Sequence, residues 1–426
     1  MKLIRRHPLW ALIGLGAVAR LVLAFAFVGD EDVRSWVQVD EALRADPLHV
    51  YDVNPPDSSN GIGLVWPYPP LLLIAIWLPS LLADATGLPF HGTVHLLPIL
   101  ADAAIAVAIY VYLGWRGATE RTRLAGAALV ALGPAFIAVS GFHGQFDQLA
   151  ILPAILGLML WERRSAGDRA TGSGALVGVG AAMKTVPALI ALPLLASARS
   201  AREAAGLVGS AVAVVVVVTL PFLIADPSGV LELREYRGWA GLGGLSLVVD
   251  PGHGAAWMQE GVEFRTPNAA AEFVADGASA ITVLALFILA VFLLRVRPAP
   301  IDGAVLLWLT IYAFSPNFFM NYLVWGLPFF VMAGYLRETA ILQAALIPAI
   351  AIYYLSPFDD ATPATAIYVP TMIGLWGFWV VALVVVARRA LRRRPPRMPA
   401  VQEPLVEVGA SGARPLAVRS GHPGGA

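Results

Sequence analysis

The stretch PLWALIGLGAVARLVLAFAFVGDED, residues 8–32, decides the class of this protein. Residues 8–28 are long enough to cross a lipid bilayer, which takes about 20 apolar residues. Basic residues precede this run, so we expect the amino terminus to stay in the cytoplasm and the acidic cluster 29–32 to emerge on the outer face. Anionic lipid and a low dielectric disfavour carboxylates there. The cluster therefore indicates an active-site carboxylate at the membrane surface or, alternatively, the start of a solvated loop.

Composition extends the membrane assignment to most of the chain. Of the 426 residues, 58% are hydrophobic and only 14% are charged, against about 25% charged residues in soluble domains. Mean hydropathy is +0.72. The apolar runs are too long and too uniform for barrel strands, so an all-α polytopic membrane protein is expected. Cysteine is absent, which excludes disulfides, thiol nucleophiles and thiolate metal sites.

Basic clusters mark the cytoplasmic side and set the order of the spans. They predict a bundle of roughly 11–13 transmembrane helices within residues 1–387, followed by a disordered cytoplasmic tail, 388–426. The predicted spans are 8–28, 93–114, 122–140, 147–161, 204–224, 278–294, 302–316, 322–336, 339–355 and 366–387. The apolar stretch 172–196 is either one crossing or a hairpin of two short helices.

This order of spans leaves two large segments outside the cell. The first, 29–92, contains the apolar piece 68–84, whose length suits an interfacial or re-entrant helix. The second, 225–277, is polar and rich in glycine. Two large outer loops are more typical of an enzyme or a receptor than of a channel.

Polar residues collect at the predicted outer ends of the helices. The turn SGFHGQFDQ, residues 140–148, brings His143, Gln145 and Asp147 together, and these donors and acceptors suit a sugar or a phosphate. Lys184 is one of only two lysines and lies inside an apolar run; at the tip of a hairpin it would face a phosphate. The bland alternatives are a hydrated turn and a lysine that reaches a lipid headgroup.

Other candidates are weaker. Asn317 and Asn321 lie in SPNFFMNYLVWGLP, residues 315–328, whose aromatic residues also suit an interfacial belt. Arg237 in the second outer loop could bind a phosphate or a headgroup. Nucleotide-binding, nucleophile-elbow and HExxH motifs are absent, and no basic patch suggests nucleic acid.

The order of these motifs resembles the GT-C superfamily of integral-membrane glycosyltransferases, which use polyprenyl-phosphate sugars. The resemblance covers roughly residues 8–335 and rests on DVRSW at 32–36, YPPL at 68–71, HGQFD at 143–147, MKTVPAL at 183–189 and the turn at 315–328. It is closest to bacterial mannosyl- and glucosyltransferase-like members. The threonine and valine between Lys184 and Pro187 depart from the family's usual pattern.

The resemblance implies an inverting transfer of a hexose, mannose favoured, to an extracytoplasmic acceptor. Asp32 is then the catalytic base, with Asp30 as the substitute. The substrate-binding residues expected are His143, Gln145, Asp147, Lys184, Tyr68, Arg237, Asn317 and Asn321. No cofactor is certain; Mg²⁺ or Mn²⁺ between Asp32 and Asp147 stays undecided.

Partners and location follow from the same interpretation. The partners expected are membrane lipid, a polyprenyl-phosphate-sugar donor and a glycan, glycolipid or protein acceptor. Abundant Arg, Ala, Pro and Gly with scarce Lys suggests a high-GC bacterium, hence a multi-pass plasma-membrane protein with both termini cytoplasmic and the active site outside. The alternatives are a transporter or lipid-linked-sugar flippase and a non-catalytic scaffold. The sequence decides neither the sugar, nor the acceptor, nor the oligomeric state.

Overall fold

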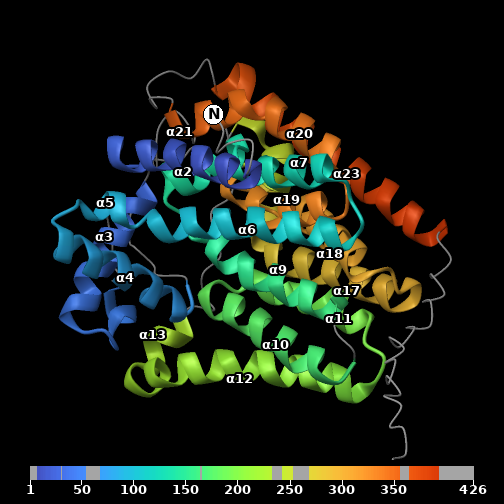
Figure 1. Cartoon of the computed structure of the whole chain (residues 1–426), viewed down its shortest axis with the longest axis horizontal. Coiled ribbons are helices and arrows are strands. Elements are labelled where there is room, and N and C mark those ends of the chain that lie inside the picture. Colours follow the sequence, from blue (N-terminus) through green and yellow to red (C-terminus); the bar gives the residue numbers. More distant parts are fainter. Residues whose placement is uncertain are drawn as a thin grey trace, which may run out of the picture.

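A computed structural model describes most of the chain as a bundle of helices (Figure 1). The described residues are 7–29, 31–53, 68–163, 166–232, 242–252, 268–355 and 364–392. Every regular element in these ranges is helical, which confirms the all-α polytopic class. The predicted tail, apart from its first residues up to 392, and parts of both outer loops lie outside the described residues.

Six helices in the described ranges are long and apolar enough to cross a membrane. They are α2 (Pro8–Ala26), the continuous α5–α6 (Phe90–Trp115), α7 to η2 (Glu120–His143), α12 (Ala201–Ala225), α17 (Ala278–Val296) and the segment ending in α23 (Ala366–Arg392). The pair α20 (Leu336–Ala345) and α21 (Ile347–Leu355), bent by 46°, makes a seventh if it counts as one span. The remaining helices that the expected count of 11–13 needs are shorter or less apolar.

The shorter elements complete the bundle and its outer parts. They are α3 (Glu31–Ala45), η1 (Val50–Val53), α4 (Leu71–Thr86), α9 (Asp147–Arg163), α10 (Ala166–Met183), η3 (Val186–Ile190), α11 (Ala191–Ala196), α13 (Pro227–Glu232), α14 (Gly244–Val249), α16 (Ala269–Asp276), α18 (Pro300–Phe314), η5 (Met320–Tyr322), α19 (Leu323–Met332) and η6 (Ala364–Tyr368). Within the span from α7 to η2, α7 (Glu120–Ala131) is followed by α8 (Pro134–Ala138) and by the π-helical turn η2 (Val139–His143).

Helix α9 defines the two ends of the bundle, because Asp147 is its first residue and Arg163 its last. At the Arg163 end, the Trp161 indole donates a hydrogen bond to Ser197 just after α11. At the Asp147 end, Lys184 just after α10 contacts Asp147. The stretch 172–196 is therefore a hairpin whose tip is at Lys184: α10 runs toward the Asp147 end and η3–α11 returns.

Helices α3, α4 and α13 gather at the Asp147 end, on the left of Figure 1. They share a separate apolar core, to which α3 contributes Val33, Trp36 and Val39 and α4 contributes Leu72 and Ile76. Arg44, in the last turn of α3, binds Asp40, Ser80 and Asp84 and so ties the far ends of α3 and α4 together. The predicted interfacial piece 68–84 thus corresponds to α4, which packs beside α3.

A buried ion pair fastens α2 to the rest of the bundle. Arg20 is 2% exposed, and its Nε lies 3.0 Å from Asp102 of α6 and 2.9 Å from Ser140 of η2. Its Nη atoms donate to backbone carbonyl groups of α2 and α7. A charge at this depth is tolerated because every side of the guanidinium meets an acceptor.

Candidate active site

Of the two candidate acidic residues that the structure describes, Asp32 is more accessible than Asp147. Its Oδ2 lies 2.5 Å from His143 Nε2 and also accepts a hydrogen bond from Gln145. The carboxylate side chain remains 33% exposed, whereas His143 is 6% exposed. His143 Nδ1 lies 2.9 Å from the hydroxyl of Tyr354. Because a carboxylate only accepts, the proton between Asp32 and His143 belongs to Nε2.

The local backbone explains how residues so far apart in sequence meet. Asp32 sits in the first turn of α3, while His143 ends the π-helical turn η2. Gly144 follows with φ of +72°, a left-handed conformation that glycine adopts without strain. Trp36, one turn beyond Asp32 on α3, donates its indole N–H to the Gly144 carbonyl at 3.0 Å. This bond holds the start of α3 against the HGQFD turn.

Asp147 forms a second group that is closed to solvent. The carboxylate is 0% exposed and accepts hydrogen bonds from Lys184 Nζ at 2.5 Å, from the Trp325 indole at 2.5 Å and from Asn321 Nδ2 at 2.8 Å. These donors come from the hairpin tip, α19 and η5. One buried carboxylate therefore joins three segments of the chain, and its charge is balanced by Lys184.

Aromatic rings surround the lysine. Its Nζ lies 5.0 Å from the centre of the Tyr68 ring and 5.7 Å from that of Trp325. Tyr322 stacks on Trp325 with ring centres 3.9 Å apart, and Trp36 approaches Tyr68 at 5.8 Å. Such rings stabilise an ammonium group through their π faces. They also offer flat apolar surfaces beside the Asp32 group.

The electrostatics keep Asp32 ionised. Burial would by itself raise the pKa of the Asp32 carboxyl group, but the charge and hydrogen bond of His143 and the hydrogen bond of Gln145 outweigh it. The charge of Lys184 lowers the pKa further, so the net result is a pKa below the usual value. The influence of Lys184 on both carboxylates makes the Asp32 and Asp147 groups one electrostatic unit.

The residues present do not fit a divalent metal between Asp32 and Asp147. N–H donors take up both oxygens of Asp147 and Oδ2 of Asp32. Within the described ranges, no group of three or more His, Asp or Glu side chains could hold an ion. Mg²⁺ and Mn²⁺ prefer several oxygen ligands, so we derive no step through a metal.

The structure brings together most, but not all, of the residues singled out from the sequence. One connected group contains Asp32, His143, Gln145, Asp147, Lys184, Tyr68 and Asn321. Asn317 belongs elsewhere: it lies in the 315–317 segment that packs against α14, and its buried Oδ1 has no partner among the described residues. Asp30 and Arg237 lie outside the described residues.

Sequence reasoning missed three contributors to this group: Trp36, Trp325 and Tyr354. Trp36 and Trp325 stand inside motifs quoted for the family resemblance, DVRSW and the 315–328 turn, so a signal was available for both. No sequence signal pointed to Tyr354. It lies on α21, outside the motifs quoted above, and its contact with His143 joins residues 211 positions apart.

The fold defines a class of protein: a polytopic membrane protein, here with an acidic and aromatic group of residues at one end of its helices. The sequence model of glycosyltransferase family 87 matches residues 66–316, more than half of the chain. The chain therefore belongs to glycosyltransferase family 87, a GT-C-like family, and the predicted resemblance is confirmed. No curated protein matches the chain. The family match includes Asp147 and Lys184 but begins after Asp32.

Replacing Gly144 by alanine should disturb the apposition of α3 and the HGQFD turn. A Cβ there would lie 2.8 Å from Val33 Cγ2 and 3.0 Å from His95 Cε1, in addition to the strain of its positive φ. Gly117→Ala is a matched control, because Gly117 has φ of +76° and nothing within 4 Å of its Cβ position. We expect a loss of about 1–2 kcal/mol from strain in both variants and about 1–3 kcal/mol more in Gly144→Ala.

Thermal unfolding of the two purified variants in the same detergent measures this difference. Equal melting temperatures for Gly144→Ala and Gly117→Ala would contradict the close packing described around Gly144.

Proposed function

We propose that this glycosyltransferase is an inverting enzyme that moves a hexose, mannose favoured, from a polyprenyl-phosphate donor to an extracytoplasmic acceptor. The observation that carries the proposal is the Asp32 carboxylate, partly exposed and kept ionised by His143 and Gln145. Family membership supplies the glycosyl transfer itself. The sugar and the polyprenyl carrier rest on the resemblance of the motifs to the GT-C superfamily.

In this mechanism Asp32 is the general base. The acceptor hydroxyl oxygen attacks the anomeric carbon, the bond from that carbon to the phosphate oxygen breaks, and the hydroxyl proton moves to the Asp32 carboxylate. The polyprenyl phosphate leaves with the electron pair of the broken bond. A single displacement inverts the anomeric configuration. His143 and Gln145 orient the carboxylate toward the acceptor and stabilise its charge before the transfer.

Lys184 is proposed to stabilise the charge that the phosphate gains as it leaves. One N–H of its ammonium group is bound to Asp147, and the other two make no hydrogen bond within the part of the chain described. The side chain is 12% exposed, so it can present these donors at the edge of the site. Asp147, Asn321 and Trp325 then position the lysine, and Tyr68 covers it.

The site is proposed to open outside the cell, with both termini cytoplasmic. Arg116, Arg163, Arg169 and Arg199 lie together at the opposite end of the bundle, where the positive-inside rule places the cytoplasm. We further propose that residues 1–387 form one catalytic unit, in which segments 29–92 and 225–277 enclose the site and α4 lies at the outer interface. The acceptor is then a glycan, glycolipid or protein presented on that side.

Asp32→Asn should leave the fold intact and lower the transfer rate at least about 100-fold, because the amide cannot accept the proton. Asp46→Asn, just beyond the opposite end of α3 and 58% exposed, is the control and should keep normal activity. The assay follows transfer of radiolabelled mannose from polyprenyl phosphate mannose in membranes that carry each variant. Near-normal turnover by Asp32→Asn would remove Asp32 from the mechanism.

The pH dependence of transfer should report the support that His143 gives to Asp32. The carboxylate must be ionised to act as a base, so the rate falls as pH drops through its pKa. His143→Gln removes the positive charge, which lets the lowered pKa of Asp32 rise. The acidic limb of kcat/KM against pH should therefore move to higher pH in this variant. An acidic limb at the same pH as in the unaltered enzyme would contradict this assignment.

Cysteine labelling tests the proposed orientation, and the absence of native cysteine removes any background. Glu41 on α3 and Arg121 at the start of α7 are both exposed and lie toward opposite ends of the bundle. In intact cells, an impermeant maleimide should label Glu41→Cys but label Arg121→Cys only after the membrane is opened. The reverse pattern would place the candidate site in the cytoplasm.

A further inference from the structure

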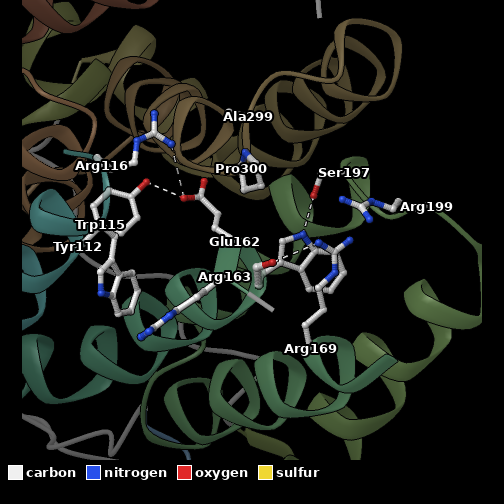
Figure 2. A pocket seen from close by; sticks show the side chains of 11 residues that line it. Tyr112, Trp115, Arg116, Glu162, Arg163, Arg169, Ser197, Arg199, Ala299 and Pro300 are labelled. Atoms are coloured by element: carbon white, nitrogen blue, oxygen red, sulfur yellow. Dashed lines mark hydrogen bonds and ion pairs between the residues drawn. The ribbon is translucent and has the colours of Figure 1, made fainter. Parts of the chain in front are cut away.

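A cavity of about 440 Å³ lies at the Arg163 end of the bundle, remote from the candidate active site (Figure 2). The ends of α6, α9 and α11 and the start of α18 enclose it. Asp147 and Glu162 occupy opposite ends of α9, which at 1.5 Å per residue puts the two sites about 22 Å apart. The cavity is large enough for a ligand of several atoms beyond a single ion.

Four arginines line this cavity: Arg116, Arg163, Arg169 and Arg199 (Figure 2). Among the described lining residues, Glu162 is the single carboxylate. Both oxygens of the Glu162 carboxylate already have hydrogen-bond partners: one accepts from the Tyr112 hydroxyl at 2.7 Å and the other from the Ile301 amide at 3.1 Å. The cavity thus presents an excess of positive charge.

Two described carboxylates lie near the cavity without being part of its lining. Glu203 binds Arg169 from behind the cavity, and Asp302, in the first turn of α18, acts on Glu162 without lining the cavity. Like charges held around one space repel one another, so an anion in the cavity would relieve that repulsion.

The Arg169 guanidinium is held in place by two of its three nitrogen atoms. Arg169 is 7% exposed; its Nε binds Glu203 and its Nη1 binds the Trp161 carbonyl at 3.2 Å. Its Nη2 makes no hydrogen bond to any described residue. Its plane lies over Trp161, with Cζ 4.6 Å from the ring centre. The Arg169 guanidinium is therefore held in position, while the two N–H donors on its Nη2 remain without a described partner.

The arginines at the mouth of the cavity are held in a similar way. Arg163 lies over the exposed Trp115, with Cζ 4.3 Å from the ring centre, and Arg116 stays 4.0 Å from Glu162, beyond hydrogen-bond distance. Within the described ranges neither guanidinium makes a hydrogen bond. Guanidinium groups with parallel N–H donors match the paired oxygens of a phosphate group, as they do those of a carboxylate.

We propose that this cavity binds a phosphate group, supplied by the headgroup of an anionic phospholipid in the adjacent leaflet. The cavity opens at the ends of membrane-crossing helices, and Trp115 beside it is 43% exposed, as suits a residue at the lipid interface. Basic pockets between helices at this depth bind phospholipid headgroups. The site is separate from glycosyl transfer, and its test needs no sugar donor.

Lipid binding by the purified full-length chain tests the proposal. Native mass spectrometry in mild detergent follows the titration of the protein with phosphatidylglycerol and, separately, with phosphatidylcholine. We expect saturable binding of phosphatidylglycerol at one strong site and a weaker response to phosphatidylcholine. The double variant Arg116→Gln/Arg163→Gln should bind phosphatidylglycerol at least about tenfold more weakly, since two charged donors are lost.

Two further variants separate this effect from general charge and from misfolding. Arg121→Gln/Arg202→Gln removes two exposed arginines at the same end of the bundle but outside the lining, and its affinity should change little. Ala299→Asp places a carboxylate in the lining at the uncapped start of α18. Aspartate is a good helix cap, so this variant should keep its melting temperature while losing phosphatidylglycerol binding.

Inorganic phosphate and pyrophosphate form the second arm of the experiment. Saturable binding of either ion without any preference for phosphatidylglycerol, abolished in Ala299→Asp, would assign the phosphate to a soluble molecule and overturn the lipid assignment. Equal losses in the lining and control double variants, or no saturable binding of any of these probes, would overturn the site itself.

Discussion

The buried carboxylate of Asp147 is the constraint on which the rest of the site depends. An unpaired charge inside an apolar bundle is costly, so this group must be met by a cation and by further donors. Lys184, Asn321 and Trp325 meet that requirement from the α10–η3 hairpin tip, η5 and α19. These three segments, which lie up to 178 positions from Asp147 in the sequence, are thereby fixed against the first residue of α9.

A second buried charge supports the same region from the other side. Arg20 and Asp102 share Ser140, whose hydroxyl donates to Asp102 at 2.6 Å. The carbonyl of Ser140 in turn meets His95 Nδ1 at 2.7 Å. Since Ser140 lies in the π-helical turn that ends at His143, the ion pair inside the bundle sets the position of the residue that holds Asp32. A chain of contacts therefore connects the buried Arg20–Asp102 ion pair with the candidate catalytic carboxylate of Asp32.

The sequence predicted the class of the protein, whereas it did not predict the individual contacts among the candidate site residues. Apolar runs and basic clusters are local signals, and HGQFD and the isolated Lys184 are visible without any knowledge of the fold. The pairing of Asp32 with His143 is not local, because it depends on how α3 turns back after α2. Arg20 escaped notice for a related reason: a single arginine hardly changes the hydropathy of residues 8–28, and its partner Asp102 lies 82 positions away. Asn317 is close to Asn321 in the sequence but lies outside this group, because its segment packs against α14.

The two carboxylates differ in a way that divides their roles. Asp147 is closed to solvent and both of its oxygens accept hydrogen bonds from N–H donors, so a substrate hydroxyl cannot reach it. Asp32 is one-third exposed, with its described partners on a single oxygen. A proton acceptor must be reachable as well as ionised, and only Asp32 meets both conditions. The family match begins after Asp32 and contains Asp147, so it covers the framework of the site and not the carboxylate that we propose as the base.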